Sequence, residues 1–443
     1  MPTTIPKMAI FTMGLENPTL GSDELRASRR AMKCGRPKRR SYNAALKLIQ
    51  VMVGLAIFAG TVPAQVVVVP PKEKKVLTGA ERTTEYLPLL QGARVAVVSN
   101  QTGLIGGKHL VDSLLSHGVQ IAKVFAPEHG FRGEAANGEL VKDEKDMRTG
   151  LPIISLYGKN KKPSAEQLQD VDVILFDIQD VGVRFYTYIS TLHQIMEAAA
   201  ELDRKVIVLD RPNPNGFYVD GPVLDLKHSS FVGMHPVPLV HGMTIGEYAG
   251  MINGEGWLRN GSKCDLKVIA CEGYDHNTYY ELPVPPSPNL PNMSSIYLYP
   301  SLGLFEGTIV SVGRGTDRPF QCIGYPGSPI GKYKFTPQSR PGAKDPPHEG
   351  LECTGLDLSD YGEFQSRLDR SIKLHWLIGM YRESPDKSKF FNNFFDKLAG
   401  GSELRQRIIA GDDEETIRAA WKPHLMEFMK TRQKYLLYDD VVR

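Results

Sequence analysis

The sequence contains few cysteines and lacks several common catalytic motifs. Only five of its 443 residues are Cys, and their spacing is not that of a zinc site. It has no Gly-x-x-x-x-Gly-Lys phosphate loop, and no Gly-x-Gly-x-x-Gly follows the first predicted strand. A Gly-x-Ser-x-Gly nucleophile elbow is also absent. These absences argue against a nucleotide-binding enzyme and against a serine hydrolase of that fold, and we expect no metal and no cofactor.

Positive charge is concentrated at the N-terminus. Residues 1–64 contain ten Lys or Arg and three Asp or Glu, a net charge of +7. Since the whole chain carries +3, the remainder carries −4 (3 − 7). A nucleic-acid partner is therefore not expected, because its binding needs a basic surface.

The same N-terminal segment has the order of features typical of an export signal. Basic residues precede an apolar run at 51–59, and Val-Pro-Ala at 62–64 offers small residues for cleavage. The run is short for a membrane span. We predict a signal peptide over 1–64, a linker over 65–80, a periplasmic or secreted protein, and no stable membrane insertion after cleavage. An uncleaved anchor is the alternative.

Four cysteines follow the predicted signal, at positions 264, 271, 322 and 353. An exported protein meets oxidising conditions, in which Cys264 and Cys271 can form a disulfide. The other interpretation is that all four are small buried thiols. Both interpretations stay open at this stage.

Apolar runs that alternate with helical patterns predict an α/β fold with a mostly parallel sheet. The best helix is 189–203, whose apolar residues recur at helical spacing. Proline crowds residues 283–300, so we place a domain boundary there, between an α/β domain at 81–295 and a smaller α+β domain at 296–443. Further strands are predicted at 94–100, 121–127, 152–157, 171–177, 206–210, 265–271 and 308–313, and further helices at 110–117, 164–169, from 244, 364–381, 401–409 and 414–438.

Three predicted strands end in charged residues. The carboxyl ends of parallel strands line one crevice, where ligands bind. Glu128, Asp177, Asp180 and Asp210 are therefore expected in one cleft. Convergent carboxylates are typical of an enzyme. The arginines expected beside them are Arg132, Arg184 and Arg211.

The sharpest motif is Pro-Glu-His-Gly-Phe-Arg-Gly-Glu at 127–134. A partly desolvated Glu128 beside His129 would have a raised pKa, which suits a general acid. Arg132 would bind an anionic group of the substrate. The structural alternative is a Glu–Arg ion pair that pins the loop.

Two more segments are candidates: one carries aromatic residues beside carboxylates and Arg, as a sugar or other polyol site needs, and the other has Asp210 and Arg211 at a strand end, where they could face the cleft. The first, Asp-Ile-Gln-Asp-Val-Gly-Val-Arg-Phe-Tyr-Thr-Tyr, covers 177–188, and the second, Asp-Arg-Pro-Asn-Pro-Asn-Gly, covers 210–216. In each, helix capping or turn formation would explain the residues equally well. A last group, of candidate substrate contacts, comprises Tyr186, Asn213, Asn289, Glu306, Arg314 and Thr316.

Taken together, these motifs resemble the exo-β-N-acetylmuramidase family of bacterial cell-wall hydrolases. The resemblance is carried by Phe-Ala-Pro-Glu-His-Gly-Phe-Arg-Gly at 125–133, the run at 176–188, Asp-Arg-Pro-Asn-Pro at 210–214 and Gly-Arg-Gly-Thr at 313–316, and it extends from about residue 80 to the C-terminus. It implies a Rossmann-like catalytic domain and a smaller domain that closes the cleft. It also implies release of N-acetylmuramic acid from the non-reducing ends of peptidoglycan fragments.

Under this resemblance, Glu128 is the main catalytic candidate and His129, Asp177 and Asp180 are further candidates. Glycosidases usually use two carboxyl groups. The partner of Glu128 stays open among Asp177, Asp180, Asp210 and Glu306, and a substrate-assisted route is a further alternative. The competing functions are a non-catalytic wall-binding protein and an esterase or amidase, for which Ser99 is the tempting serine.

Overall fold

The computed structural model describes residues 75–128, 130–132, 144–158 and 160–440. They belong to one compact unit, residues 73–443. The predicted signal peptide lies outside the described residues, as do His129 and residues 133–143 of the following loop. No helix of the described ranges is long and apolar enough to cross a membrane.

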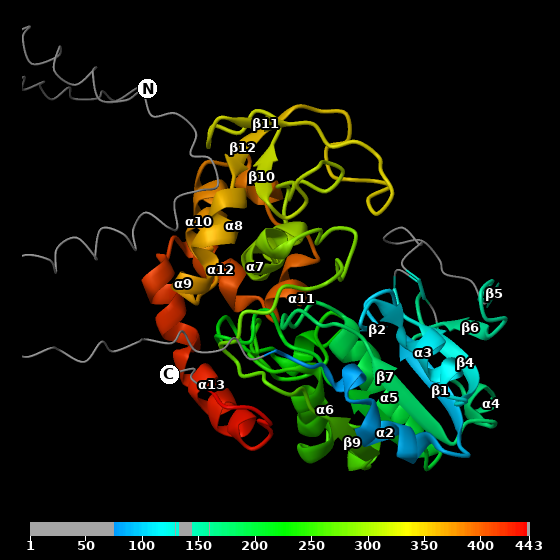
Figure 1. Ribbon diagram of the computed structural model, residues 1–443. Coiled ribbons are helices and arrows are strands. Elements are labelled where there is room, and N and C mark those ends of the chain that lie inside the picture. Colours follow the sequence, from blue (N-terminus) through cyan, green and yellow to red (C-terminus); the bar gives the residue numbers. More distant parts are fainter. Residues whose placement is uncertain (1–74, 129, 133–143, 159, 441–443) are drawn as a thin grey trace, which may run out of the picture. The chain divides into compact units, whose positions relative to one another are not determined.

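A seven-stranded sheet with the order β5-β6-β4-β1-β7-β8-β9 forms the N-terminal part (Figure 1). β5 is antiparallel to β6, and the other pairs are parallel. This confirms the predicted α/β class with a mostly parallel sheet. The strands are β1 (Arg94–Ser99), β4 (Gln120–Ala126), β5 (Glu144–Lys145), β6 (Pro152–Ser155), β7 (Val173–Asp177), β8 (Lys205–Leu209) and β9 (Asp265–Ile269), and a small hairpin pairs β2 (Leu104–Ile105) with β3 (Lys108–His109).

Both faces of the sheet are buried, which explains its continuous apolar strands. Along β1, Val95 and Val97 pack in the core that contains Leu110 of α3 (Leu110–Ser116). Ala96 and Val98 point the other way, into the core that contains Leu192 of α5. The helices of this part are α2 (Thr83–Tyr86), α3, α4 (Ala165–Leu168), α5 (Tyr188–Glu201) and α6 (Ile245–Gly254), with 3-10 turns η3 (Gly79–Glu81), η4 (Leu87–Leu90), η5 (Leu226–His228) and η6 (Arg259–Gly261).

The C-terminal part combines a small antiparallel sheet, of order β10-β12-β11, with helices (top of Figure 1). Its strands are β10 (Cys322–Tyr325), β11 (Tyr333–Phe335) and β12 (Cys353–Asp357). Its helices and 3-10 turns are α7 (Met293–Leu302), η7 (Gly303–Gly307), α8 (Ser359–Phe364), α9 (Ser366–Asp369), α10 (Leu374–Arg382), η8 (Lys387–Lys389), α11 (Phe395–Ala399), α12 (Glu403–Ala410) and α13 (Glu414–Gln433).

Two predicted elements of this part are wrong. Residues 308–313 form no strand, because Thr308 and Ser311 make isolated bridges to different segments, at Phe391 and Gly324. The predicted helix 364–381 is broken at Arg370, whose φ of 47° ends α9. α13, by contrast, continues through Pro423.

One hydrophobic core crosses the predicted domain boundary at residue 295. It contains Ile189 of α5, Leu302 of α7 and Leu377 of α10. Residues on the two sides therefore hold a fixed geometry relative to one another, which matters because the site described below takes side chains from both.

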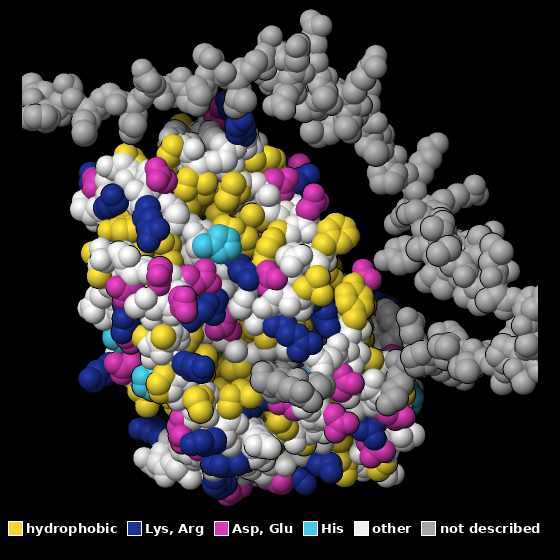
Figure 2. Space-filling view, turned by 90° about the vertical axis from the view of Figure 1, so that its left-hand side faces the viewer, with side chains coloured by type: hydrophobic (Ala, Val, Ile, Leu, Met, Phe, Trp, Pro, Cys, Tyr) yellow, Lys and Arg dark blue, Asp and Glu magenta, His cyan; other side chains and the backbone are white. Residues whose placement is uncertain are grey.

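All four described cysteines are free and buried. The suggested Cys264–Cys271 disulfide is therefore not formed, and the interpretation as buried thiols holds. Burial raises the pKa of the Cys264 thiol to about 12. On the face shown in Figure 2, positive and negative side chains are interspersed.

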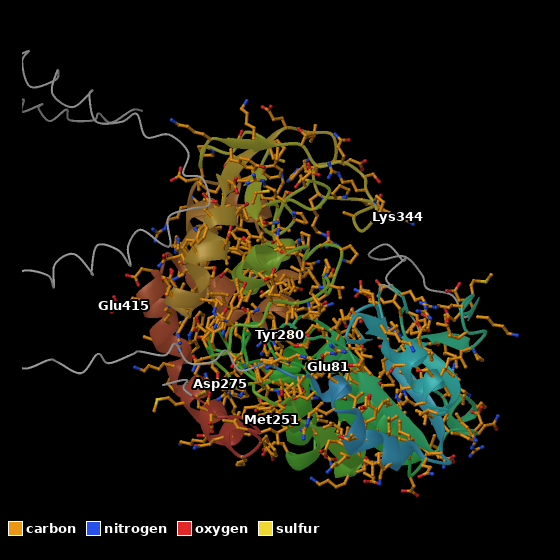
Figure 3. The ribbon with its side chains drawn as sticks, viewed as in Figure 1. Glu81, Met251, Asp275, Tyr280, Lys344 and Glu415 are labelled. Carbon is orange, nitrogen blue, oxygen red and sulfur yellow. The ribbon has the colours of Figure 1, made fainter. Side chains whose placement is uncertain are left out.

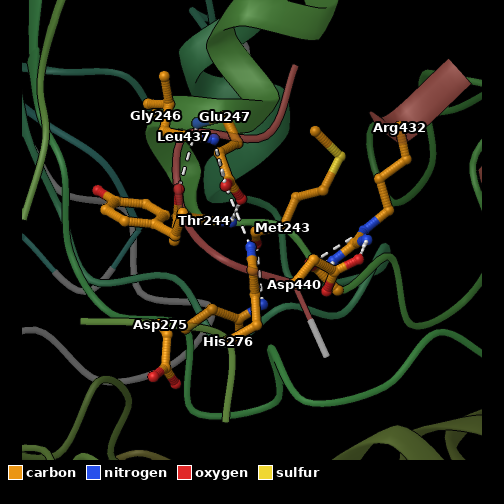
Figure 4. A network of polar contacts seen from close by, with 12 residues as sticks. Met243, Thr244, Gly246, Glu247, Asp275, His276, Arg432, Leu437 and Asp440 are labelled. Carbon is orange, nitrogen blue, oxygen red and sulfur yellow. Dashed lines mark hydrogen bonds and ion pairs between the residues drawn. The ribbon is translucent and has the colours of Figure 1, made fainter. Parts of the chain in front are cut away.

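The C-terminal tail is tied to the large-sheet part by a polar network (Figure 4). Arg432 is buried, pairs with Asp440 and donates to the Gly242 carbonyl. The Leu437 amide donates to Glu247, a residue of α6. These contacts fix the tail beside the first turn of α6, as the close-up shows.

Candidate active site

Glu128 lies in the wall of a cavity of about 220 Å³ that takes residues from both parts of the chain. A second cavity, of about 510 Å³, shares Glu306, Arg314 and Phe394 with it, so the two adjoin. We call the first the inner cavity and the second the outer cavity. The inner cavity is lined by Glu128, Phe185, Tyr186, Thr187, Tyr188, Val232, Ser287, Asn289, Leu290, Tyr299, Glu306, Arg314, Phe320 and Phe394.

Glu128 reaches the inner cavity from the end of β4, where the apolar run stops at Pro127. Burial raises the pKa of its carboxyl group. The positive charge of Arg314 and a hydrogen bond from Tyr157 oppose this shift, and the neighbouring Glu306 adds to it. The net raised pKa favours the protonated form, as the sequence predicted for a general acid.

Glu306 and Arg314 form an ion pair in the wall common to both cavities, with 2.5 Å between Arg314 Nη1 and Glu306 Oε1. Glu306 lies in η7. Arg314 stands between two glycines of positive φ, Gly313 at 77° and Gly315 at 80°. A Cβ on Gly315 would lie 2.5 Å from the Gln338 carbonyl oxygen, so this turn requires glycine.

Aromatic side chains form much of the inner cavity's wall. Tyr186 packs edge-to-face on Tyr188 and Tyr299, with ring centroids 4.9 and 5.9 Å apart. The Tyr186 hydroxyl donates to the Pro286 carbonyl, and Asn100 Nδ2 donates to the Tyr188 hydroxyl. Rings held this way offer the apolar surface that a sugar face packs against.

The carboxylates at the ends of β7 and β8 do not line either cavity. Asp177 is fully buried and pairs with Arg211, whose Nε lies 2.6 Å from Asp177 Oδ1. This pair occupies the strand ends where the sequence placed a catalytic Asp177 and a substrate-binding Arg211. The expected convergence with Glu128 therefore fails, because each charge is neutralised inside the protein.

Asp180 and Asp210 are likewise interior. Asp180 accepts a hydrogen bond from the Gly182 amide, and burial raises its pKa to about 7. Asp210 binds the Thr244 hydroxyl, the Gly246 amide and the Tyr438 hydroxyl at the start of α6. Burial raises its pKa to about 6. Neither residue lines the inner or the outer cavity.

Arg132 and Arg184, like Arg211, have structural partners. Arg132 pairs with Asp112 and Asp146, two aspartates outside its own motif, and, within the described residues, not with a glutamate as the structural alternative had it. Arg184 is fully buried, and its guanidinium donates to the Pro222, Val237 and Leu398 carbonyls. The expectation that they line the cleft is not met, and Arg314 is the candidate arginine that does line it.

Of the remaining candidate residues, some line the inner cavity and others make structural contacts instead. Asn289 and Tyr186 line the inner cavity. Asn213 is buried and donates to the Met243 carbonyl, while the Thr316 hydroxyl donates to Gly313 within the Arg314 turn. His129 lies outside the described residues.

Several lining residues were not singled out from the sequence. Tyr157 follows β6 and lines the outer cavity, so the strand-end rule that found Glu128 could have found it. Tyr299 also lines the inner cavity and was in no predicted motif, whereas Tyr188, which lines it too, belongs to the predicted segment 177–188. Phe394, between η8 and α11, carries no sequence signal of a site.

The structure also bears on the serine and metal alternatives. Ser99 is fully buried, and its hydroxyl faces the Asn100 carbonyl at 3.4 Å rather than a base. Within the described ranges, no group of three His, Cys, Asp or Glu side chains is placed to hold a metal ion.

Comparison with protein families matches both parts of the chain. Residues 95–294 match the family model described as exo-β-N-acetylmuramidase NamZ, N-terminal, and residues 297–438 match its C-terminal counterpart. The chain is 39% identical over 395 residues to the peptidoglycan β-N-acetylmuramidase NamZ of Bacillus subtilis strain 168. That alignment covers 83% of this chain and 92% of the relative.

Two solved structures of DUF1343 family proteins from Bacteroides fragilis are similar throughout. One superposes with a TM-score of 0.77 at 48% identity and covers 83% of this chain and 99% of its own. The other has a TM-score of 0.70 at 30% identity and covers 83% and 100%.

Proposed function

Because the chain belongs to the exo-β-N-acetylmuramidase family, we propose that it removes N-acetylmuramic acid from the non-reducing ends of peptidoglycan fragments, with Glu128 and Glu306 as its two catalytic carboxyl groups. The protein is a glycosidase of cell-wall turnover. The observation that carries the residue assignment is the presence of Glu128, Glu306 and Arg314 in one aromatic-walled cavity.

Glu128 is the general acid of this proposal. Burial raises the pKa of its carboxyl group, which favours the protonated form that an acid needs. As the bond between the anomeric carbon and the bridging oxygen breaks, this proton passes to the departing oxygen, which leaves as the hydroxyl of the next sugar. Water adds a hydroxyl group to the anomeric carbon, and the remaining proton of that water replaces the one that Glu128 has given up.

Glu306 is the second carboxyl group. Among the four candidate partners of Glu128, it is the one that lines the same cavity. Its carboxylate pairs with the adjacent Arg314. An ionised carboxylate supports the positive charge that develops on the sugar ring in the transition state.

Arg314 supplies the contact that muramic acid needs. That sugar carries a lactyl carboxylate, and a guanidinium binds carboxylates through paired N–H groups. The ion pair with Glu306 is made through Nη1. Tyr186, Tyr188 and Tyr299 would pack against the sugar ring.

The two adjoining cavities divide the substrate at the scissile bond. The inner cavity holds Glu128 and the tyrosines, so it takes the muramic acid residue. The outer cavity takes the sugar that leaves. Figure 3 shows Lys344, which lines the outer cavity, on a loop of the C-terminal part.

Product analysis on a defined N-acetylmuramic acid–N-acetylglucosamine disaccharide tests this function. The parental protein should release both sugars, and Glu128→Gln and Glu306→Gln should each lose at least about 100-fold in kcat. Glu415→Gln is the matched control, because Glu415 is exposed on α13 and lies on the opposite side of the view in Figure 3 from Lys344. Tight binding of the disaccharide without any product would show that the protein binds the fragment but does not cleave it.

The proposal extends to location. Peptidoglycan lies outside the cytoplasmic membrane, and residues 1–64 have the charge and apolar pattern of a signal peptide. We expect these residues to direct a fused alkaline phosphatase to an active, exported form. Activity confined to the cytoplasm in the same cells would contradict export.

A further inference from the structure

Phe394 is the uncharged member of the three residues that line both cavities. The other two, Glu306 and Arg314, form the ion pair described above. The scissile bond of the proposed substrate would lie at this junction, because the inner cavity takes muramic acid and the outer cavity takes the leaving sugar. The proposed function gives roles to the two charged residues and none to Phe394.

Phe394 differs from the other phenylalanines of its segment. Phe390 and Phe395 are fully buried, and Phe391 packs on both, with ring centroids 4.9 and 4.5 Å apart. Phe394 is 38% exposed, and no aromatic ring of the described residues packs against it. Single exposed apolar side chains are common on protein surfaces, so the position of Phe394 between the two cavities is the informative observation.

Phe394 is also the most exposed aromatic residue of the outer cavity. Of the other two aromatic residues that line it, Phe305 is fully buried and Tyr157 is half-buried. A sugar that enters the outer cavity next to the ion pair would therefore meet the ring of Phe394 as its main aromatic surface.

The backbone of Phe394 is fixed to the segment that carries Glu306. The Phe394 amide donates to Asn392 Oδ1 at 2.8 Å, and Asn392 Nδ2 donates to the Glu306 carbonyl at 3.3 Å. The Asn392 amide donates to the Gly307 carbonyl at 2.9 Å. A Cβ on Gly307 would lie 2.4 Å from Phe395 Cα, so the two segments are in close contact. The ring is therefore attached to backbone that is held in place beside the proposed catalytic carboxyl group.

We propose that Phe394 is a stacking platform for the sugar that leaves, an exposed ring against which the N-acetylglucosamine ring packs. The faces of this sugar ring carry C–H groups, and aromatic side chains provide a flat apolar surface of matching size. The inference rests on the proposed function and adds to it a residue that determines the preference for a leaving group. Neither the sequence motifs nor the resemblance identified this residue.

The contact should act on binding and not on the chemical step. The leaving sugar keeps its ring shape during the reaction, and only its bridging oxygen gains a proton. A contact that is equally strong in the ground state and in the transition state lowers KM without raising kcat. Loss of the Phe394 ring should therefore raise KM for substrates with a sugar leaving group, and for those alone.

The test measures KM and kcat of Phe394→Ala on the disaccharide and on the β-fluoride of N-acetylmuramic acid, whose leaving group is a single atom. On the disaccharide, KM should rise about tenfold while kcat stays within about twofold of the parental value. On the fluoride, both constants should stay within about twofold of the parental values. Phe394→Tyr keeps the ring and should keep the parental KM on both substrates. Phe364→Ala is the control, because Phe364 is 65% exposed on α8 and lines neither cavity.

The two substrates also separate this inference from the proposed function. A higher KM on both would place the ring against muramic acid, and a lower kcat on both would assign Phe394 a role in the fold. Either result, or an unchanged KM on the disaccharide, would overturn the platform while the proposed function stands. If the parental protein released neither sugar from the disaccharide, the proposed function would fail, and the platform with it.

Discussion

Arg314 Nη1 lies 2.5 Å from Glu306 Oε1, and both residues line the cavity that contains Glu128. The ion pair joins an anion of η7 to a cation of the following glycine turn. It leaves Glu128 as the carboxyl group of this cavity that has a raised pKa and no ion-pair partner among the described residues. Glycoside cleavage usually uses two carboxyl groups in different roles.

Arg314→Ala should reduce selectivity for muramic acid. Without the guanidinium, the lactyl carboxylate loses its charged partner, which is worth about 1.5–3 kcal/mol. We expect kcat/KM to fall at least about tenfold more on a muramic acid glycoside than on the corresponding N-acetylglucosamine glycoside. Arg407→Ala on α12 is the control. Equal losses of kcat/KM on both substrates would show that Arg314 does not recognise the lactyl carboxylate.

Gly315→Ala should impair the same site through the backbone. The substitution places a Cβ 2.5 Å from the Gln338 carbonyl at a φ of 80°, so the Arg314 turn must shift. We expect activity to fall about tenfold or more. Gly327→Ala is a matched control, because Gly327 also has a positive φ but no atom lies within 4 Å of the added Cβ. Equal effects of the two substitutions would show that φ alone matters.

Asp177→Asn should destabilise the fold while leaving the chemistry intact. It leaves the Arg211 charge buried and unpaired, which costs about 3–5 kcal/mol. Chemical denaturation should show this loss, and kcat of the folded variant at low temperature should stay near the parental value. Parental stability combined with a kcat reduced by two orders of magnitude would restore the catalytic interpretation.

Asp180→Asn should flatten the dependence of stability on pH. The folded-state pKa of Asp180, about 7, lies above the usual value of 3.8, so the folded protein binds this proton more tightly than the unfolded chain does. Its stabilisation is therefore present at low pH and is lost as pH rises from about 4 to 7. One pKa unit is about 1.4 kcal/mol. The difference between the unfolding free energies at pH 5 and pH 8 should be at least ~1 kcal/mol smaller in the variant than in the parent. An unchanged difference would show that Asp180 is not the source of this pH dependence.

The sequence predicted the large sheet well because its signal is local. Each strand buried on both faces is a short apolar run, and the alternation of Val95 and Ala96 between two cores follows from strand geometry. The strand-end rule placed Glu128 in a cavity wall. The predicted strand at 308–313 was wrong because this apolar run makes single β-bridges to two different segments and does not form a ladder with one strand.

The site was harder to predict because charge at a strand end has two possible uses. Asp177 and Arg211 neutralise each other in the interior, whereas Glu128 faces a cavity. The choice depends on which partners the fold brings near, and these come from distant positions. Glu306, the partner of Glu128 proposed here, lies 178 positions further along the chain, beyond the predicted domain boundary.

The most direct test of the central assignment compares two leaving groups in Glu128→Gln. The disaccharide needs a proton on its departing oxygen, whereas a 2,4-dinitrophenyl muramic acid glycoside does not. If Glu128 is the general acid, the variant loses at least about 100-fold in kcat/KM on the disaccharide and less than about tenfold on the activated glycoside. An equal loss on both substrates, or none on either, would contradict the assignment.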